Sequence, residues 1–91
     1  MWFVYIVRCD DRSLYTGITT DAERRVAEHN EGRGARYTRS RSPVSLVYVE
    51  RAEDRGAALR REWEIKRMSP AGKQELVARA RRGKRKTTRR S

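Results

Sequence analysis

The feature that most constrains the fold is a continuous apolar run near the start of the sequence, from Trp2 to Val7. A short run of this kind is typical of a strand buried on both faces, so we expect a strand over residues 2–8 at the centre of a sheet. Residues 10–13 are turn formers, and residues 14–18 return as a second strand. Gly17 falls where the chain leaves the sheet, and a glycine there permits unusual dihedrals or the close approach of another group.

The hairpin is followed by a helix start. Residues 20–23 (Thr-Asp-Ala-Glu) fit the capping box, in which a Thr hydroxyl and a Glu carboxylate satisfy backbone N–H groups reciprocally. The helix is predicted over residues 21–31 and ends at Gly32. Arg25 and His29 stand four residues apart on it, so they project from one face, on the inward side of the helix. An arginine and a histidine that face the tyrosines of the hairpin could bind a phosphate group.

A third strand and two further helices complete the expected fold. An apolar run over residues 44–49 predicts the third strand. Asp54 is the expected N-cap of a helix over residues 54–68. A serine–proline pair at 69–70 starts a last helix that ends near Arg81. The elements therefore follow the order β-β-α-β-α-α, which is an α+β arrangement.

Basic residues are concentrated at the end of the sequence. We expect one domain over residues 1–81 and a disordered basic tail over residues 82–91. The formal net charge is +11, and the stretch from Arg79 to Ser91 contains no acidic residue. Such a stretch predicts an arm that binds a polyanion, or a tail that only keeps the protein soluble. The candidate nucleic-acid contacts in the tail are Lys84, Arg85 and Lys86.

A second basic segment is the predicted loop over residues 32–42, which is rich in Gly, Arg and Ser. Guanidinium groups, hydroxyls and backbone N–H groups could together follow a phosphate backbone, with Tyr37 stacked on a base. The alternative is a solvated connector with Tyr37 packed against the body of the protein. The dominance of Arg over Lys favours contact with a polyanion. The candidate contacts are Arg33, Arg36, Tyr37, Arg39 and Arg41.

Several classes of protein are excluded by composition. Cys9 is the single cysteine, so the chain has neither a disulfide framework nor a cysteine pair for zinc. No apolar run approaches the ~20 residues that span a bilayer, and no signal peptide is apparent before the first strand. We expect a cytoplasmic protein that does not contact membranes and associates with the nucleoid when it binds DNA.

One carboxylate lies in the middle of an apolar helix face. Glu62 shares a stripe of the second helix with Ala58 and Ile65. A carboxylate that is directed inward needs a partner, which a metal ion or a cationic side chain would supply. An internal salt bridge to Arg25 is one alternative. We expect Trp63, the next residue, to contribute to packing.

The ordered set of Tyr5, Tyr15, Arg25, His29 and Glu62 resembles the GIY-YIG nuclease superfamily. The first family motif corresponds to residues 4–6 (Val-Tyr-Ile), with valine in place of glycine, and the second to residues 15–17 (Tyr-Thr-Gly). The resemblance covers about residues 2–68. Residues 29–38 and 59–66 are similar to the small, stand-alone bacterial branch of the superfamily. The resemblance implies a central three-stranded antiparallel sheet flanked by helices, and cleavage of phosphodiester bonds with one divalent metal ion.

The resemblance also implies a role for each side chain. Glu62 would hold Mg²⁺ or Mn²⁺, because hard cations prefer carboxylate and water oxygens. Arg25 would clamp the phosphate oxygens through its planar guanidinium. Tyr5 would accept the proton of the attacking water, and Tyr15 and His29 would orient water or shuttle protons. A free phenol titrates near pH ~10, so a tyrosine base needs a nearby cation such as Arg25 or the metal.

These observations favour a metal-dependent endonuclease that hydrolyses DNA phosphodiester bonds, with selectivity for DNA structure, in DNA repair or recombination. DNA is favoured over RNA as the partner. One alternative is a nucleic-acid-binding module with weak or no catalysis, which uses the same fold and relies on its basic tail. Another is an adaptor whose basic arm contacts an acidic protein.

Overall fold

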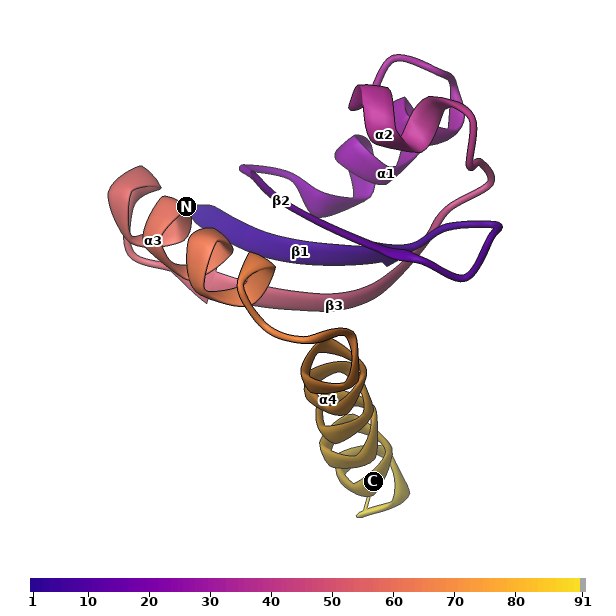
Figure 1. The fold of residues 1–91 in the computed structure, drawn as a ribbon. Helices are drawn as coiled ribbons and strands as arrows, with labels where there is room; N and C mark the ends of the chain where they lie inside the picture. The colour runs from indigo at the N-terminus through magenta and orange to yellow at the C-terminus, as the bar shows by residue number, and fades with distance from the viewer. Residues whose placement is uncertain (91) are drawn as a thin grey trace.

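The structure is a computed structural model that describes the backbone of residues 1–90 and the side chains of residues 1–81. The chain forms an α+β fold in which a three-stranded sheet is flanked by helices (Figure 1). The elements are β1 (Trp2–Arg8), β2 (Leu14–Thr19), α1 (Ala22–Asn30), α2 (Arg36–Arg39), β3 (Ser45–Ala52), α3 (Arg55–Lys66) and α4 (Pro70–Arg90). The predicted order of elements is confirmed, and the short helix α2 is added within the segment that we expected to be a loop.

The sheet is antiparallel and has the order β2-β1-β3, which confirms that the first strand is central. In the register, Tyr5 lies opposite Gly17 on β2 and opposite Val49 on β3. Because successive side chains point to opposite faces of a sheet, Tyr5 and Val7 face one side and Val4 faces the other. The strand order places β2 at one edge of the sheet, next to Tyr5.

Each face of the sheet has its own core. Val4 and Ile6 pack with Ala58 and Ile65 of α3 and with Val77 of α4. On the opposite face, the buried residues are Tyr5, Val7, Cys9 and Val44, joined by the partly buried Tyr15 and Val26. Figure 1 shows the corresponding layers, with α1 and α2 on one side of the sheet and α3 and α4 on the other.

The helix caps agree with the sequence patterns at two of three positions. Asp54 accepts a hydrogen bond from the backbone N–H of Ala57, and the Ser69 hydroxyl accepts one from that of Gly72. The capping box at residues 20–23 is wrong, because the N-cap of α1 is Asp21, whose carboxylate accepts from the N–H of Arg24 at 3.1 Å. A carboxylate is at least as good an N-cap as a threonine hydroxyl, which explains the shift by one residue.

The last helix is longer than we expected, since α4 spans Pro70–Arg90 and does not end near Arg81. The backbone is helical through Arg90, and the disordered tail that we expected over residues 82–91 stays a prediction. Arg, Lys and Ala are among the better helix formers, and no proline follows Pro70, so nothing in the sequence forces an earlier end. Lys84, Arg85 and Lys86 lie outside the described side chains, so their role, and the division into a domain and a tail, stay predictions.

Helix α3 presents an exposed aromatic side chain that we expected to be packed. Trp63 is 60% exposed, and the guanidinium of Arg67 lies 4.3 Å from its ring centroid. The helix turns Ile65 and Ala58 toward the sheet, and this rotation leaves Trp63 on the outer side. Among the described residues, no helix is both long enough and apolar enough to cross a membrane.

Candidate functional site

The side chain of Tyr5 lies across the edge strand. Tyr5 is 1% exposed, and a Cβ atom built on Gly17 would stand 2.6 Å from the Tyr5 Oη and 2.8 Å from its Cζ. Such distances are far below van der Waals contact, so only a glycine at position 17 lets the ring cross β2. The phenol oxygen thereby reaches the β2 side of the sheet, where the remaining site residues gather.

A chain of buried hydrogen bonds begins at this phenol. The Tyr5 Oη lies 2.9 Å from His29 Nε2, and His29 Nδ1 lies 2.7 Å from Thr38 Oγ1. The Thr38 hydroxyl donates to the backbone carbonyl of Ala35 at 2.9 Å. His29 and Thr38 are both 0% exposed. A Cβ atom at Gly34 would stand 2.1 Å from His29 Nδ1, so this glycine is also needed for the close approach.

Arg25 lies beside the same phenol. Its guanidinium pairs with Glu28 at 2.9 Å and is near enough to the Tyr5 phenol to affect its pKa. Burial raises the pKa of Tyr5 to about 12, and the nearby Arg25 lowers this pKa by a smaller amount. The cation that we expected to favour the phenolate is therefore present but is outweighed by burial. Burial, and next the positive charge of Arg25, lowers the pKa of His29. Tyr5 and His29 are thus both neutral near pH ~7.

Tyr15 joins the histidine to the basic segment. Its ring contacts the His29 ring edge-on at 5.6 Å between centroids and stacks on the Tyr37 ring at 5.7 Å. The guanidinium of Arg41 lies 4.0 Å from the Tyr37 centroid and pairs with Asp11 at 3.0 Å. Tyr37 therefore packs against the body of the protein while it stays 38% exposed. Its predicted stacking on a base stays a prediction.

Glu62 approaches from the opposite layer. Its Oε2 pairs with Lys66 Nζ at 3.1 Å, and Lys66 Nζ lies 5.7 Å from the Tyr15 ring centroid. The Glu62 carboxylate is also close enough to Tyr5 to contribute to the raised pKa of the phenol. Helix α3 packs against β2 as well as β1, so the Glu62–Lys66 pair lies near the edge strand that carries Tyr15. The cation that pairs with Glu62 is thus Lys66, and the alternative of a Glu62–Arg25 salt bridge is wrong, because Arg25 pairs with Glu28.

The donor set suits a hydrated hard cation and not a closed protein cage. Among the described residues, there is no group of three or more His, Cys, Asp or Glu side chains that could hold a metal ion. The side chain of Glu62 is 18% exposed, so one carboxylate is accessible at the site. A Mg²⁺-like ion keeps several waters and is often held by one or two carboxylates together with substrate phosphate oxygens. The residues present fit such an ion, provided that Lys66 gives up part of its contact with Glu62.

The other predicted contacts lie around this centre. Arg33 is paired with Glu31, and Arg36 and Arg39 are exposed on α2. The structure therefore brings together Tyr5, Tyr15, Arg25, His29 and Glu62, with Gly17 beneath the first of them and α2 alongside. Sequence reasoning missed Thr38 and Lys66. For Lys66, the spacing of four residues from Glu62 was an available signal, because such pairs meet on a helix face.

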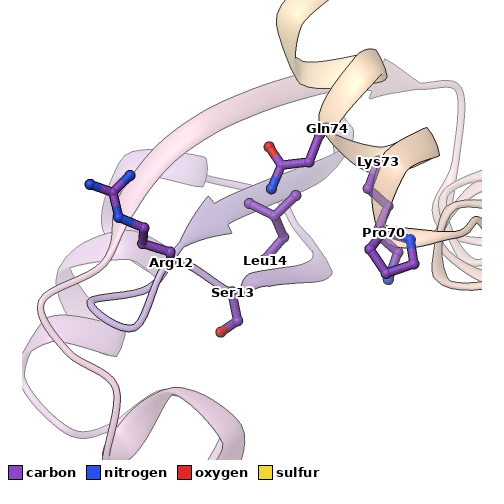
Figure 2. A pocket seen from close by; sticks show the side chains of 6 residues that line it. All are labelled: Arg12, Ser13, Leu14, Pro70, Lys73 and Gln74. Atoms are coloured by element: carbon purple, nitrogen blue, oxygen red, sulfur yellow. The ribbon is translucent and has the colours of Figure 1, made fainter.

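A separate pocket lies beside the β1–β2 turn. It measures about 270 Å³ and is bounded by residues of the β1–β2 turn and of the first turns of α4, as Figure 2 shows. The residues that line it are Arg12, Ser13, Leu14, Pro70, Lys73 and Gln74. None of them belongs to the predicted site, so the candidate chemistry is carried by the cluster around Tyr5 and not by this pocket.

Comparison with known proteins decides the family. The GIY-YIG catalytic domain matches residues 1–75, which include all five clustered side chains. The chain belongs to the GIY-YIG family. A UPF0213 protein of Desulfotalea psychrophila is 57% identical over 83 residues, which are 90% of this chain and 76% of that protein. A UPF0213 protein of Natronomonas pharaonis is 57% identical over 76 residues, which are 84% of this chain and 89% of that protein.

Two solved structures confirm the GIY-YIG fold. The solution NMR structure of a UPF0213 protein from Bacillus halodurans has a TM-score of 0.56 and 44% identity, over 86% of this chain and 84% of that one. The solution NMR structure of an E. faecalis protein has a TM-score of 0.54 and 38% identity, over 84% and 82% of the two chains. The GIY-YIG domain implies a nuclease family with nucleic acid as its substrate, and divalent metal ions are general among its members.

Proposed function

We propose that this protein is a metal-dependent endonuclease that hydrolyses DNA phosphodiester bonds, with selectivity for branched or otherwise non-duplex DNA. The observation that carries the proposal is the meeting of four side chains from β1, α1 and α3 at the β2 edge of the sheet. They are Tyr5, Arg25, His29 and Glu62. A phenol, an imidazole, a guanidinium and a carboxylate in one place supply proton transfer, charge stabilisation and metal binding.

The proton of the attacking water moves through Tyr5 to His29. As the water oxygen forms its bond to phosphorus, its proton passes to the Tyr5 Oη, and the proton of Tyr5 passes to His29 Nε2 across the 2.9 Å hydrogen bond. The phenol is never required as a free phenolate, which agrees with a pKa raised to about 12. The bond from phosphorus to the 3′ oxygen breaks, and that oxygen leaves with the electron pair and takes a proton from solvent.

Arg25 and Glu62 support this step from two sides. Arg25 lies beside Tyr5 and would stabilise the negative charge that develops on the phosphate oxygens. Glu62 would hold Mg²⁺ or Mn²⁺. A divalent ion at this carboxylate would supply Lewis-acid polarisation of the phosphate and charge neutralisation for the departing oxygen.

The basic surface suits a DNA backbone. Arg36 and Arg39 are exposed on α2, which adjoins the site through Thr38 and Tyr37. Arginines in this position would hold the phosphates that flank the cleaved bond, and the basic residues Lys84, Arg85 and Lys86 would extend the contact. A role in DNA repair or recombination, in the cytoplasm and at the nucleoid, follows from a DNA substrate of this kind.

One observation favours a second candidate function. The carboxylate of Glu62 is held by Lys66 at 3.1 Å, so the protein itself neutralises the expected metal ligand. A chain in which this pair persists on DNA would bind nucleic acid without cutting it. The two functions differ in the fate of the phosphodiester bond and not in affinity.

Cleavage of defined DNA substrates tests the proposal. Branched, nicked, single-stranded and duplex DNA, with a matched RNA, are incubated with the purified chain in Mg²⁺ or Mn²⁺ and in EDTA. Tyr5→Phe and Glu62→Gln should abolish cleavage but leave DNA binding intact. Glu64→Gln is the matched control on the same helix, because Glu64 is exposed and pairs with Arg61. Cleavage that survives Tyr5→Phe and Glu62→Gln would reject the assigned site, and binding without any cleavage would establish the second function.

A further inference from the structure

We propose that Thr38 is a positioning residue that fixes the tautomer of His29, with the proton on Nδ1 and a bare Nε2 that faces Tyr5. This inference deepens the proposed function, since the proton transfer described above requires an unprotonated Nε2. It assigns a task to helix α2, whose four residues are Arg36–Arg39. The direction of the buried hydrogen bonds leads to this tautomer.

At the Thr38 end, a backbone carbonyl fixes the direction of the hydrogen bonds. The Ala35 carbonyl can only accept, and the Thr38 Oγ1 lies 2.9 Å from it, so the proton of the Thr38 hydroxyl points to Ala35. The Thr38 oxygen then has only lone pairs to offer to His29 Nδ1, at 2.7 Å. His29 must therefore donate from Nδ1, which leaves Nε2 without a proton.

At the other end, the Tyr5 hydroxyl meets the bare nitrogen. A phenol can donate, and the Tyr5 Oη lies 2.9 Å from His29 Nε2, so with the imidazole proton on Nδ1 the Tyr5 proton points to Nε2. The hydrogen bonds then run in one sense from Tyr5 through His29 and Thr38 to Ala35, and bonds aligned in this way strengthen one another.

Because His29 and Thr38 are buried, the loss of a hydrogen bond between them is costly. His29 and Thr38 are 0% exposed, and no buried side-chain N or O atom lacks a hydrogen-bond partner among the described residues. Loss of the Thr38 hydroxyl would leave Nδ1–H unpaired in a dry site, and the imidazole would gain by moving its proton to Nε2. That tautomer would donate to Tyr5 and could no longer accept its proton.

The tautomer can be measured directly, because His29 is the single histidine of the chain. The ¹⁵N spectrum of the full chain, free of DNA and metal, should show a protonated Nδ1 and an unprotonated Nε2. Thr38→Val should shift the signals toward the Nε2–H form, and Thr38→Ser should restore the original pattern. Thr16→Val is the matched control, because Thr16 is also buried but pairs with Ile6 and so faces the other core.

Tyr5→Phe gives a second test that does not depend on the folding of the Thr38→Val variant. If Thr38 sets the tautomer, His29 keeps its proton on Nδ1 after the phenol hydroxyl is lost. An Nε2–H form in the unaltered protein or in Tyr5→Phe, or an unchanged spectrum in Thr38→Val, would overturn the inference.

Cleavage rates separate this inference from the proposed function. Thr38→Val should lower kcat by about tenfold or more at constant KM, a modest share of the 10²–10⁴-fold that acid–base groups contribute, and Thr38→Ser should recover it. If Thr38→Val changes the tautomer but not the rate, the tautomer assignment stands and the proton transfer to His29 is rejected. A spectrum that contradicts the expected tautomer would overturn the role of Thr38 even if Tyr5 and Glu62 prove essential.

Discussion

The ring of Tyr5 lies against the backbone of Gly17 on the neighbouring strand, so closely that a methyl group at position 17 would stand 2.6 Å from the phenol oxygen. The glycine of the second motif therefore serves the tyrosine of the first. Glycine has no Cβ atom, and a Cβ at this position would occupy the space through which the phenol reaches His29. The two motifs act as one unit because they face each other across an antiparallel pair.

Gly17→Ala should displace Tyr5 and impair both folding and cleavage. A Cβ in this space forces the ring or the strand to move, and such overpacking costs about 1–3 kcal/mol. Urea unfolding measures the first effect, and the rate of cleavage should fall about as far as in Tyr5→Phe. The matched control is Gly56→Ala on α3, where a Cβ would meet no atom closer than 3.4 Å. The control should be neutral or slightly stabilising, because alanine favours a helix more than glycine does. Full activity in Gly17→Ala would refute the close packing.

Lys66→Met should strengthen the binding of a divalent ion. Lys66 pairs with the carboxylate that would hold the ion, so its removal frees the ligand and removes a positive charge. The affinity for Mn²⁺, measured by calorimetry, should rise by about fivefold, in keeping with the roughly 1 kcal/mol upper value of a partly exposed ion pair. Lys73→Met, which alters a lysine of the separate pocket, should leave the affinity unchanged. Weaker binding in Lys66→Met would show that the lysine supports the site and does not compete for it.

The stability of the protein should fall as the pH rises above about 10. In the unfolded chain Tyr5 loses its proton near pH ~10, whereas the pKa in the folded protein is raised to about 12. The unfolded state therefore releases the proton first, and the free energy of unfolding declines between these two values, by roughly 1–3 kcal/mol in total. Below about pH 10 this contribution is fully present. Urea unfolding at several pH values from ~9 to ~12 measures the decline.

Tyr5→Phe should remove this part of the alkaline decline. Tyr37→Phe, which alters a more exposed tyrosine, is the control and should keep it. An equal decline in the unaltered chain and in Tyr5→Phe would mean that the phenol of Tyr5 titrates normally.

The arginines of α2 should contribute to the salt dependence of DNA binding. Arg36 and Arg39 are exposed beside the site, and each contact with a phosphate releases counterions. The double change to Ala should reduce the slope of log K against log salt by about 0.9 for each lost contact with duplex DNA. Removal of residues 82–91 tests the tail in the same way. Arg24→Ala, on α1, is a control for the loss of one exposed charge. An unchanged slope would remove the altered segment from the interface.

The features that could be predicted from the sequence are those that appear as a pattern of apolar and charged residues along the chain. The apolar run of β1 identified the central strand, and the position of Glu62 on an apolar stripe identified a carboxylate that needed a partner. The partner itself was not predicted. The spacing of four residues pointed to Lys66, but a metal ion or Arg25 could also satisfy an inward carboxylate. The N-cap of α1 was displaced by one residue, since Thr20 and Asp21 are both good caps.

Helix α2 and Thr38 escaped prediction for a different reason. A helix of four residues is too short to show a 3.6-residue period, and its sequence is dominated by arginine. Thr38 has no distinguishing neighbour in the chain, and its partner His29 lies nine residues before it. Its importance follows only from the direction of hydrogen bonds in three dimensions.

The central place of β1 has a consequence for how the chain is made. During synthesis β1 leaves the ribosome before either neighbour, and its second edge stays open until β3, at Ser45–Ala52, has emerged. Pairs such as Trp2 with Ala52 close long loops, and non-local pairing of this kind is slow. The most apolar segment of the protein therefore waits longest for its full set of partners, and the nascent chain is most prone to aggregation in that interval.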